Sequence, residues 1–329
     1  MNITVKKNSR VAQLLGIEYP VLSAPMSWIT DAKLVAAVSE AGGLGLFGPN
    51  AGQTTVSTDP QEGKERMRRE IAKARELTKK PLGAELLCMG STSVFAEALY
   101  ELYCECDDIS VVLCLCDIPQ EWVDRLHAAG KICIHKDIMA SIESFKKAEA
   151  MGYDAVVIGG VDAGGHVNRK KTGTFTAIRM AAEATSLPLI AAGGIIDSIS
   201  VQAAGLFGAE GIYVGTRFCV SVESPIAESV KQKMCEMNVD DCLQIDGLFG
   251  PILSLATPDI QKSYELMEEG HAKNAGAITG AYAGGYRTGM VLGQIDQGIG
   301  LVDVSASIGQ IKSILTVQEI MDEFANGME

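Results

Sequence analysis

The sequence has no apolar run long enough to span a lipid bilayer, and its first residues, MNITVKKNSRVAQLLG, lack the apolar stretch of a secretory signal. Both absences argue against a membrane-spanning or exported chain. We therefore expect a cytoplasmic protein that has no membrane partner.

Basic residues are in deficit. Lys and Arg number 28 against 41 Asp and Glu, which gives a formal net charge of −13. A surface of this sign repels phosphate backbones, so we expect no nucleic-acid partner. The same charge argues against docking of a strongly acidic carrier protein, unless a local basic patch overrides the average.

The CxxC spacing of zinc knuckles is missing, although the chain has nine cysteines. Cys104 and Cys106 end a helical run, whereas Cys114 and Cys116 lie in an alternating apolar run. We interpret these cysteines as small buried hydrophobes in the reduced state, and we expect no metal site.

From residue 19 onward, short β-rich runs alternate with longer helical runs. The strands are nearly continuous apolar segments, which is typical of a parallel sheet covered on both faces. The expected strands are 19–24, 44–47, 82–87, 110–115, 131–135, 155–158, 187–191 and 211–214. Eight strand–helix units in about two hundred residues predict an α/β fold of the closed TIM (β/α)8 type, with no other internal repeat.

Residues 225–286 interrupt this rhythm, because they are rich in Met, Glu and Lys and then in Gly, Ala and Tyr. We interpret 225–286 as a small, mostly helical lid inserted near the C-terminus. The barrel then comprises 1–224 and 287–329, and an amphipathic helix over 316–324 closes it.

Glycine-rich turns follow the last two expected strands. They read AAGGI at 191–195 and YVGTRF at 213–218. Barrel enzymes often bind a phosphate after the seventh and eighth strands, where glycine lets backbone N–H groups approach the oxygens. Thr216 adds a hydroxyl donor and Arg217 a charge, so these turns predict a phosphate site.

The sixth strand ends in IGGVDAGGH, 158–166. Its four glycines suggest backbone lying flat against a planar ligand, with His166 projecting toward it as a general base or as a donor to developing charge. Asp162 either orients this imidazole or caps a turn. The remaining histidines, His127, His135 and His271, are interpreted as surface or structural residues.

Other strand ends contribute further candidates. Lys136 closes the fifth strand, where its cation would stabilise a reduced flavin, bind phosphate or simply be solvated. After the first strand, Pro25 fixes a turn, and Met26 offers a backbone N–H and a soft side chain to a ring. Trp28 either lines a substrate pocket or packs in the core.

In their order, the strings APMSWIT, AVSEAGGLG, IHKD, GGVDAGGH, AAGGI and YVGTRF resemble the nitronate monooxygenases, formerly 2-nitropropane dioxygenases. Flavin-dependent enoyl-acyl-carrier-protein reductases share this layout, and the resemblance covers about 12–218 and 288–295. It implies a TIM barrel with non-covalent FMN, a small lid and His166 as the catalytic residue. The cofactor contacts that it implies are Ala24, Pro25, Met26, Lys136, Gly164, Gly165, Ala192, Gly193, Gly194, Gly215, Thr216, Met290 and Gln294.

Two departures from the family pattern bear on the substrate. Val167 and Asn168 follow the histidine, where many members have a small or basic residue and then glycine. Glu85 stands where the family commonly has asparagine, and it would put a carboxylate close to the flavin or the lid.

The resemblance favours oxidation of an alkyl nitronate by FMN and oxygen to a carbonyl compound and nitrite. His166 would deprotonate the nitroalkane or stabilise the nitronate, and Lys136 would hold the reduced flavin. Reduction of an enoyl thioester with NAD(P)H, an NAD(P)H:quinone reductase and a flavin-free barrel binding a phosphorylated metabolite are the alternatives. The expected partner is a small-molecule substrate, either a nitronate or an enoyl thioester. The sequence leaves open whether the protein forms a homodimer.

Overall fold

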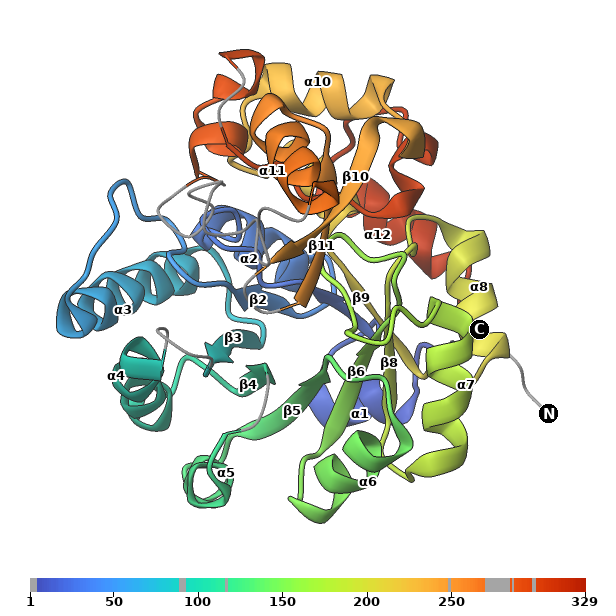
Figure 1. Ribbon diagram of the computed structural model, residues 1–329. Helices are drawn as coiled ribbons and strands as arrows, with labels where there is room; N and C mark the ends of the chain where they lie inside the picture. Colours follow the sequence, from blue (N-terminus) through green and yellow to red (C-terminus); the bar gives the residue numbers. More distant parts are fainter. Residues whose placement is uncertain are drawn as a thin grey trace.

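The structure is a computed structural model that describes residues 5–88, 93–115, 118–247, 250–269, 285, 287–297 and 300–329. Parallel strands form its centre and helices surround them, with a smaller cap on one side (Figure 1). None of the described helices is long and apolar enough to cross a membrane.

Eight parallel strands form the barrel wall, which confirms the predicted TIM barrel. Their order is β1-β9-β8-β6-β5-β4-β3-β2. A parallel bridge between Leu22 and Leu44 joins the two outer strands and closes the ring, with the Leu44 N–H donating to Val21 O at 2.8 Å. The strands are β1 (Val21–Ser23), β2 (Gly45–Phe47), β3 (Leu82–Leu87), β4 (Val111–Leu115), β5 (Ile132–Asp137), β6 (Ala155–Gly159), β8 (Leu189–Ala192) and β9 (Gly211–Val214).

Helices cover the outside of the barrel, and several begin at an aspartate. Asp31 and Asp197, for example, accept hydrogen bonds from the N–H groups of Leu34 and Ser200. The helices of the barrel are α1 (Arg10–Leu15), α2 (Ala32–Glu40), α3 (Pro60–Leu77), α4 (Ser93–Glu105), α5 (Gln120–Ala128), α6 (Ile142–Ala150), α7 (Thr174–Ala184), α8 (Ser198–Leu206), α9 (Thr216–Cys219) and α12 (Val317–Ala325).

Side chains from strands around the ring fill the barrel interior, which positions the candidate site above them. One apolar cluster joins Leu22, Leu113, Val157 and Ala192 with Tyr213. Directly paired residues of neighbouring strands face the same side of a sheet. The residues that pair with members of this cluster therefore also point inward.

The insertion is less helical than predicted. It contains α10 (Glu228–Glu236), η2 (Val239–Asp241) and α11 (Pro258–Glu268), but also an antiparallel hairpin of β10 (Cys242–Gly247) and β11 (Gly250–Leu255). β11 also pairs with a second strand, β7 (Gly165–His166), which is distant in sequence. The short elements η5 (Arg287–Val291), η6 (Gln294–Gln297) and η7 (Ala306–Gln310) lead back to the barrel.

Candidate active site

Three polar side chains enter the barrel interior from different strands. Glu85 on β3 pairs with Leu113, and Lys136 on β5 pairs with Val157; both partners are interior residues. Tyr213 on β9 belongs to the interior cluster itself. The Lys136 Nζ lies 4.9 Å from the centroid of the Tyr213 ring, a cation–π distance. The predicted placement of Lys136 and Glu85 at the site is thus consistent with the strand register.

His166 is held at the barrel mouth by the cap. It lies on β7 and pairs with Ile252 of β11, while Val167 N–H donates to Pro251 O at 3.0 Å. Burial, and then the charge of Lys136, lower the pKa of His166 to about 4. The imidazole is therefore neutral at pH 7 and can accept a proton.

Glu85 has the opposite shift. Burial raises its pKa to about 7, against the smaller effect of Lys136, which lowers it. Burial and Glu85 also raise the pKa of Tyr213, so this phenol stays protonated. Among the described residues, the buried Tyr213 hydroxyl has no hydrogen-bond partner. A donor without a partner in an interior is costly, which points to a polar group from a ligand.

The two predicted glycine turns lie on neighbouring strands. Gly193 and Gly194 follow β8 with φ of 101° and 73°, values that disfavour side chains. A Cβ on Gly193 would lie 2.8 Å from the Thr174 Oγ1. Gly215 follows β9, which pairs with β8 in parallel, so the two turns lie side by side. The backbone amides of both are thereby brought to one region of the mouth.

Two serines extend this region. Ser305 N–H donates to the Thr216 Oγ1 at 2.9 Å, so that hydroxyl keeps its own proton to donate to a ligand. Ser307 donates to the Gly194 carbonyl at 3.2 Å. Neither serine belongs to a periodic pattern or a motif, because both reach the site from the C-terminal segment.

Arg217 does not point to the turns, contrary to the prediction that it adds charge there. Its guanidinium donates to Ser313 O at 3.0 Å on the C-terminal segment. This places its charge among elements outside the barrel mouth.

The turn after β1 is partly as predicted. Gly215 lies against Ala24 and Met26, since a Cβ there would be 3.4 Å from the Ala24 Cβ and 3.6 Å from the Met26 Sδ. Pro25 is buried between them. The prediction that Met26 offers a backbone N–H is wrong, because this group donates to Thr30 Oγ1 at 3.1 Å. Its thioether remains next to the glycine turn.

Trp28 is buried, with φ of 69°, in the left-handed region that is uncommon for a bulky residue. Its N–H donates to Pro49 O at 3.0 Å. Of the two interpretations of Trp28, its 5% exposure supports packing.

The glycines before His166 permit close backbone approach. A Cβ on Gly164 would lie 2.6 Å from the Val304 carbonyl carbon, and Gly165 has φ of 66°. Asp162 Oδ2 accepts the Thr174 N–H at 2.8 Å. Asp162 therefore caps the start of α7, the second of its two predicted roles.

The last two predicted contacts lie after the insertion. Met290 is 1% exposed and belongs to the outer core, and its carbonyl accepts the Ala227 N–H at 2.9 Å. Gln294 begins η6 and is half-buried.

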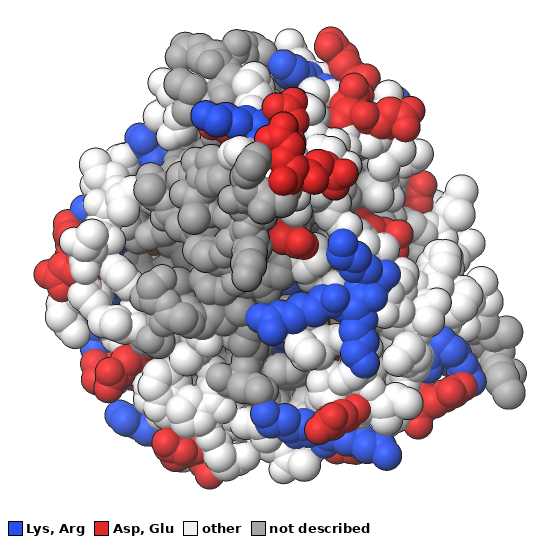
Figure 2. Space-filling model, viewed as in Figure 1, with Lys and Arg blue, Asp and Glu red and all other residues white. Residues whose placement is uncertain are grey.

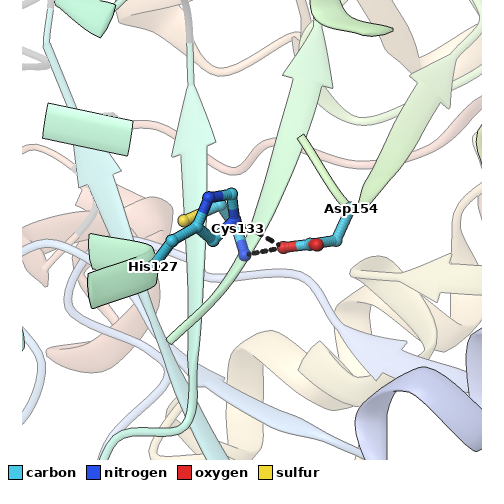
Figure 3. A group of neighbouring side chains, drawn as sticks. All are labelled: His127, Cys133 and Asp154. Atoms are coloured by element: carbon cyan, nitrogen blue, oxygen red, sulfur yellow. Dashed lines mark hydrogen bonds and ion pairs between the residues drawn. The ribbon is translucent and has the colours of Figure 1, made fainter. Parts of the chain in front are cut away.

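A second cluster, His127, Cys133 and Asp154, has the residue types of a metal site but lies elsewhere in the barrel (Figure 3). Asp154 Oδ2 is 2.9 Å from the His127 Nε2 and accepts the Cys133 backbone N–H at 2.7 Å. Burial, and then Asp154, raise the pKa of the Cys133 thiol to about 12, which disfavours the thiolate that binds metals. These hydrogen bonds account for the cluster as a structural clamp between α5 and the start of β6.

The other predicted structural residues fit their interpretation where they are described. His135 packs against the Tyr153 ring, with centroids 5.0 Å apart. Cys104, Cys106 and Cys114 are free thiols, but only Cys114 is buried as predicted, whereas Cys104 and Cys106 are half-buried. Cys116 and His271 lie outside the described residues.

Comparison with curated proteins gives relatives with two kinds of name. The chain is 29% identical over 241 residues to the Rhodococcus jostii (3aS,4S,5R,7aS)-5-hydroxy-7a-methyl-1-oxo-octahydro-1H-indene-4-carboxyl-CoA dehydrogenase. That alignment covers 72% of this chain but only 63% of the relative's own length. It is also 29% identical over 273 residues to a probable nitronate monooxygenase of Staphylococcus aureus, covering 71% of this chain and 74% of that protein.

Solved structures support the same relationship. FabK from Thermotoga maritima, an enoyl-acyl-carrier-protein reductase, is 30% identical with a TM-score of 0.84, covering 97% of this chain and 96% of FabK. The nitroalkane oxidase of Streptomyces ansochromogenes is 22% identical with a TM-score of 0.74, over 96% of this chain and 97% of that one, and so shares the fold. The family model described as nitronate monooxygenase matches residues 8–101 and 99–327, and the chain belongs to this family of oxidoreductases.

Proposed function

We propose that the protein is an FMN-dependent oxidoreductase that oxidises alkyl nitronates with oxygen. The observation that supports this most is a neutral, half-buried His166 beside the cation of Lys136, at the mouth of a barrel with two adjacent glycine turns. A base beside a cation suits a nitroalkane, which loses a proton and becomes an anion.

The residues fit FMN on three observations. Side chains are disfavoured at Gly193 and Gly194, which leaves their backbone open to a phosphate. The Thr216 hydroxyl retains a proton to donate. The buried Tyr213 hydroxyl lacks a partner among the described residues. The turns would hold the phosphate, and Lys136 and Tyr213 would face the ring system.

The chain's own residues then have distinct roles. His166 takes the proton from the carbon next to the nitro group onto an imidazole nitrogen. Lys136 stabilises the negative charge that this transfer creates, in an interior where charges interact more strongly than in water. When bound, FMN supplies electron transfer between the nitronate and oxygen. The nitronate carbon ends as a carbonyl and the nitro group leaves as nitrite.

The proposal is tested with purified holoenzyme and propyl nitronate. We expect nitrite release and oxygen uptake, and a yellow protein that releases FMN on denaturation. Anaerobic bleaching by the nitronate should precede both products. A colourless protein, or a yellow one that the nitronate does not bleach, would contradict the proposal.

The glycine cradle gives a separate prediction. Gly193→Ala is expected to weaken FMN binding at least tenfold, because alanine at this positive φ costs roughly 1–2 kcal/mol and its Cβ meets Thr174. Titration of apoprotein with FMN, followed by flavin fluorescence, measures this. Gly173→Ala is the control, since its Cβ meets nothing within 4 Å. Equal affinities of the two variants would remove the turn from the cofactor site.

A second candidate function is reduction of an enoyl thioester with NAD(P)H. It is favoured by the likeness to FabK across nearly the whole chain and by a basic loop that follows His166 directly. Steady NAD(P)H consumption on crotonyl thioester, without turnover of the nitronate, would favour this function over the first.

A further inference from the structure

Three consecutive cations follow the candidate base on a chain with a net charge of −13. Arg169, Lys170 and Lys171 are all exposed, three to five positions after His166. Figure 2 shows a group of Lys and Arg side chains where, in Figure 1, the loop before α7 runs. Neither Lys170 nor Lys171 forms an ion pair with another described residue. We name these three residues the basic loop.

The basic loop has a fixed conformation that Asn168 supports. This residue is 2% exposed, and its Nδ2 donates to Gly159 O at 3.0 Å and to Thr172 O at 2.7 Å. Its Oδ1 accepts the Thr172 N–H at 2.9 Å. Lys171 has φ of 53°, which favours glycine or asparagine over lysine. A loop clamped in this way presents its cations without the entropy cost of ordering them on binding.

The basic loop lies at the rim of the active site. Arg169 N–H donates to Ile138 O at 3.0 Å, just beyond the strand that holds Lys136. On the other side, Val167 N–H donates to Pro251 O of the cap hairpin. Since each residue spans at most ~3.6 Å, the Cα of Arg169 lies within about 11 Å of that of His166.

We propose that the basic loop binds the phosphates of an adenosine 5′-diphosphate that carries one more phosphate on its ribose, at the 3′ oxygen in coenzyme A and at the 2′ oxygen in NADP(H). Guanidinium and ammonium groups form strong charge-assisted hydrogen bonds with phosphate. A negative protein surface around a positive rim would also orient such a ligand, so that its phosphates meet the loop and its reactive end enters the barrel. Coenzyme A would bring a thioester to His166, whereas NADPH would bring a hydride donor.

This inference goes beyond nitronate oxidation, because an alkyl nitronate has no phosphate. It also accounts for the departure at Val167-Asn168, since asparagine at 168 makes the side-chain hydrogen bonds that glycine cannot make. The departure therefore adds a structured loop at the point where a long substrate would leave the barrel.

The test is binding to the holoenzyme by calorimetry, with coenzyme A, NADP⁺ and phosphate-free pantetheine as probes. The variant is Lys170→Glu with Lys171→Glu. Its matched control is Lys79→Glu with Lys80→Glu, which changes net charge equally at exposed positions before β3, at the opposite end of the barrel. We expect coenzyme A, NADP⁺ or both to bind the wild type. The affinity of the loop variant for that nucleotide should be at least tenfold lower, whereas the affinity of the control variant should stay within twofold of the wild type.

The probes distinguish coenzyme A from NADP(H) as the ligand that carries the phosphates. Loss of affinity for coenzyme A alone identifies an acyl thioester, and loss for NADP⁺ alone identifies the electron donor. Equal weakening in both double variants, no binding of either nucleotide to the wild type, or pantetheine binding as tightly as coenzyme A would overturn the proposal. Nitronate turnover of the loop variant is measured in parallel and should not change. Failure of the nitronate reaction leaves the binding experiment intact.

Discussion

Replacing His166 by alanine is expected to lower kcat for the nitroalkane by on the order of a hundred- to ten-thousand-fold, with FMN still bound. The loss follows from the removal of a neutral base that the cap holds over the barrel interior. Flavin is retained because the two glycine turns come from β8 and β9 and do not involve β7. Stopped-flow reduction and the absorbance of bound flavin measure the two effects separately.

The pH profile gives this prediction a signature that a structural role would not produce. Burial and Lys136 lower the pKa of His166 from 6.5 to about 4, so kcat/KM should hold down to about pH 4. With an ordinary histidine as the base, activity would fall below pH 6.5. His127→Ala is the control, because it also removes an imidazole but one bound to Asp154 in the structural clamp. Loss of activity in both variants, or an acid limb at 6.5, would contradict the role of His166.

The barrel could be predicted because its signals are local. Each strand is a short apolar run, and each βα unit repeats the same pattern, so strand positions and the two glycine turns follow from the sequence. The sequence also singles out His166 as a candidate, since four glycines precede it within one string.

Contacts between distant segments were not predictable. β11 is a strand because it pairs with β10 and β7, and Pro251 and Asp246 within the hairpin obscure its β character. Ser305 and Ser307 reach the turns from more than 80 residues away. The strand pattern does not show that the Thr30 hydroxyl accepts the Met26 N–H, so the sequence alone suggests that this N–H is open to a ligand.

Glu85→Gln is expected to change how stability depends on pH. The pKa of this carboxyl is 4.5 in the unfolded chain and about 7 when buried in the barrel. Between these values the folded protein keeps a proton that the unfolded chain has lost, so the contribution of Glu85 to the free energy of unfolding falls as pH rises. The difference corresponds to about 3 kcal/mol. Glutamine cannot ionise, so the advantage of the variant over wild type should grow by about this amount from pH 4 to pH 8.

Urea unfolding at several pH values measures this difference. Glu76→Gln, on the exposed side of α3, removes the same charge in water and should show no such growth. The contribution of His166 to the free energy of unfolding changes with pH in the opposite direction to that of Glu85. Because the pKa of His166 is lowered on folding, this contribution rises as pH rises from about 4 to 6.5. The contributions of these two groups to the free energy of unfolding should therefore nearly cancel between about pH 4.5 and 6.5, and removing either group should expose the contribution of the other. A constant difference between Glu85→Gln and wild type would show that the carboxyl ionises as it does in water.

The shifted pKa values of Glu85 and His166 together determine the net charge of the barrel interior around Lys136. Between about pH 4 and pH 7, Glu85 is protonated and His166 is neutral, so the ammonium of Lys136 is the remaining charge among these three groups. The pocket then attracts an anion such as a nitronate. Ionisation of Glu85 above pH 7 cancels this charge, and KM for the nitronate should rise there in the wild type. In Glu85→Gln it should stay constant, which connects the departure from the family's asparagine directly to the charge of the substrate.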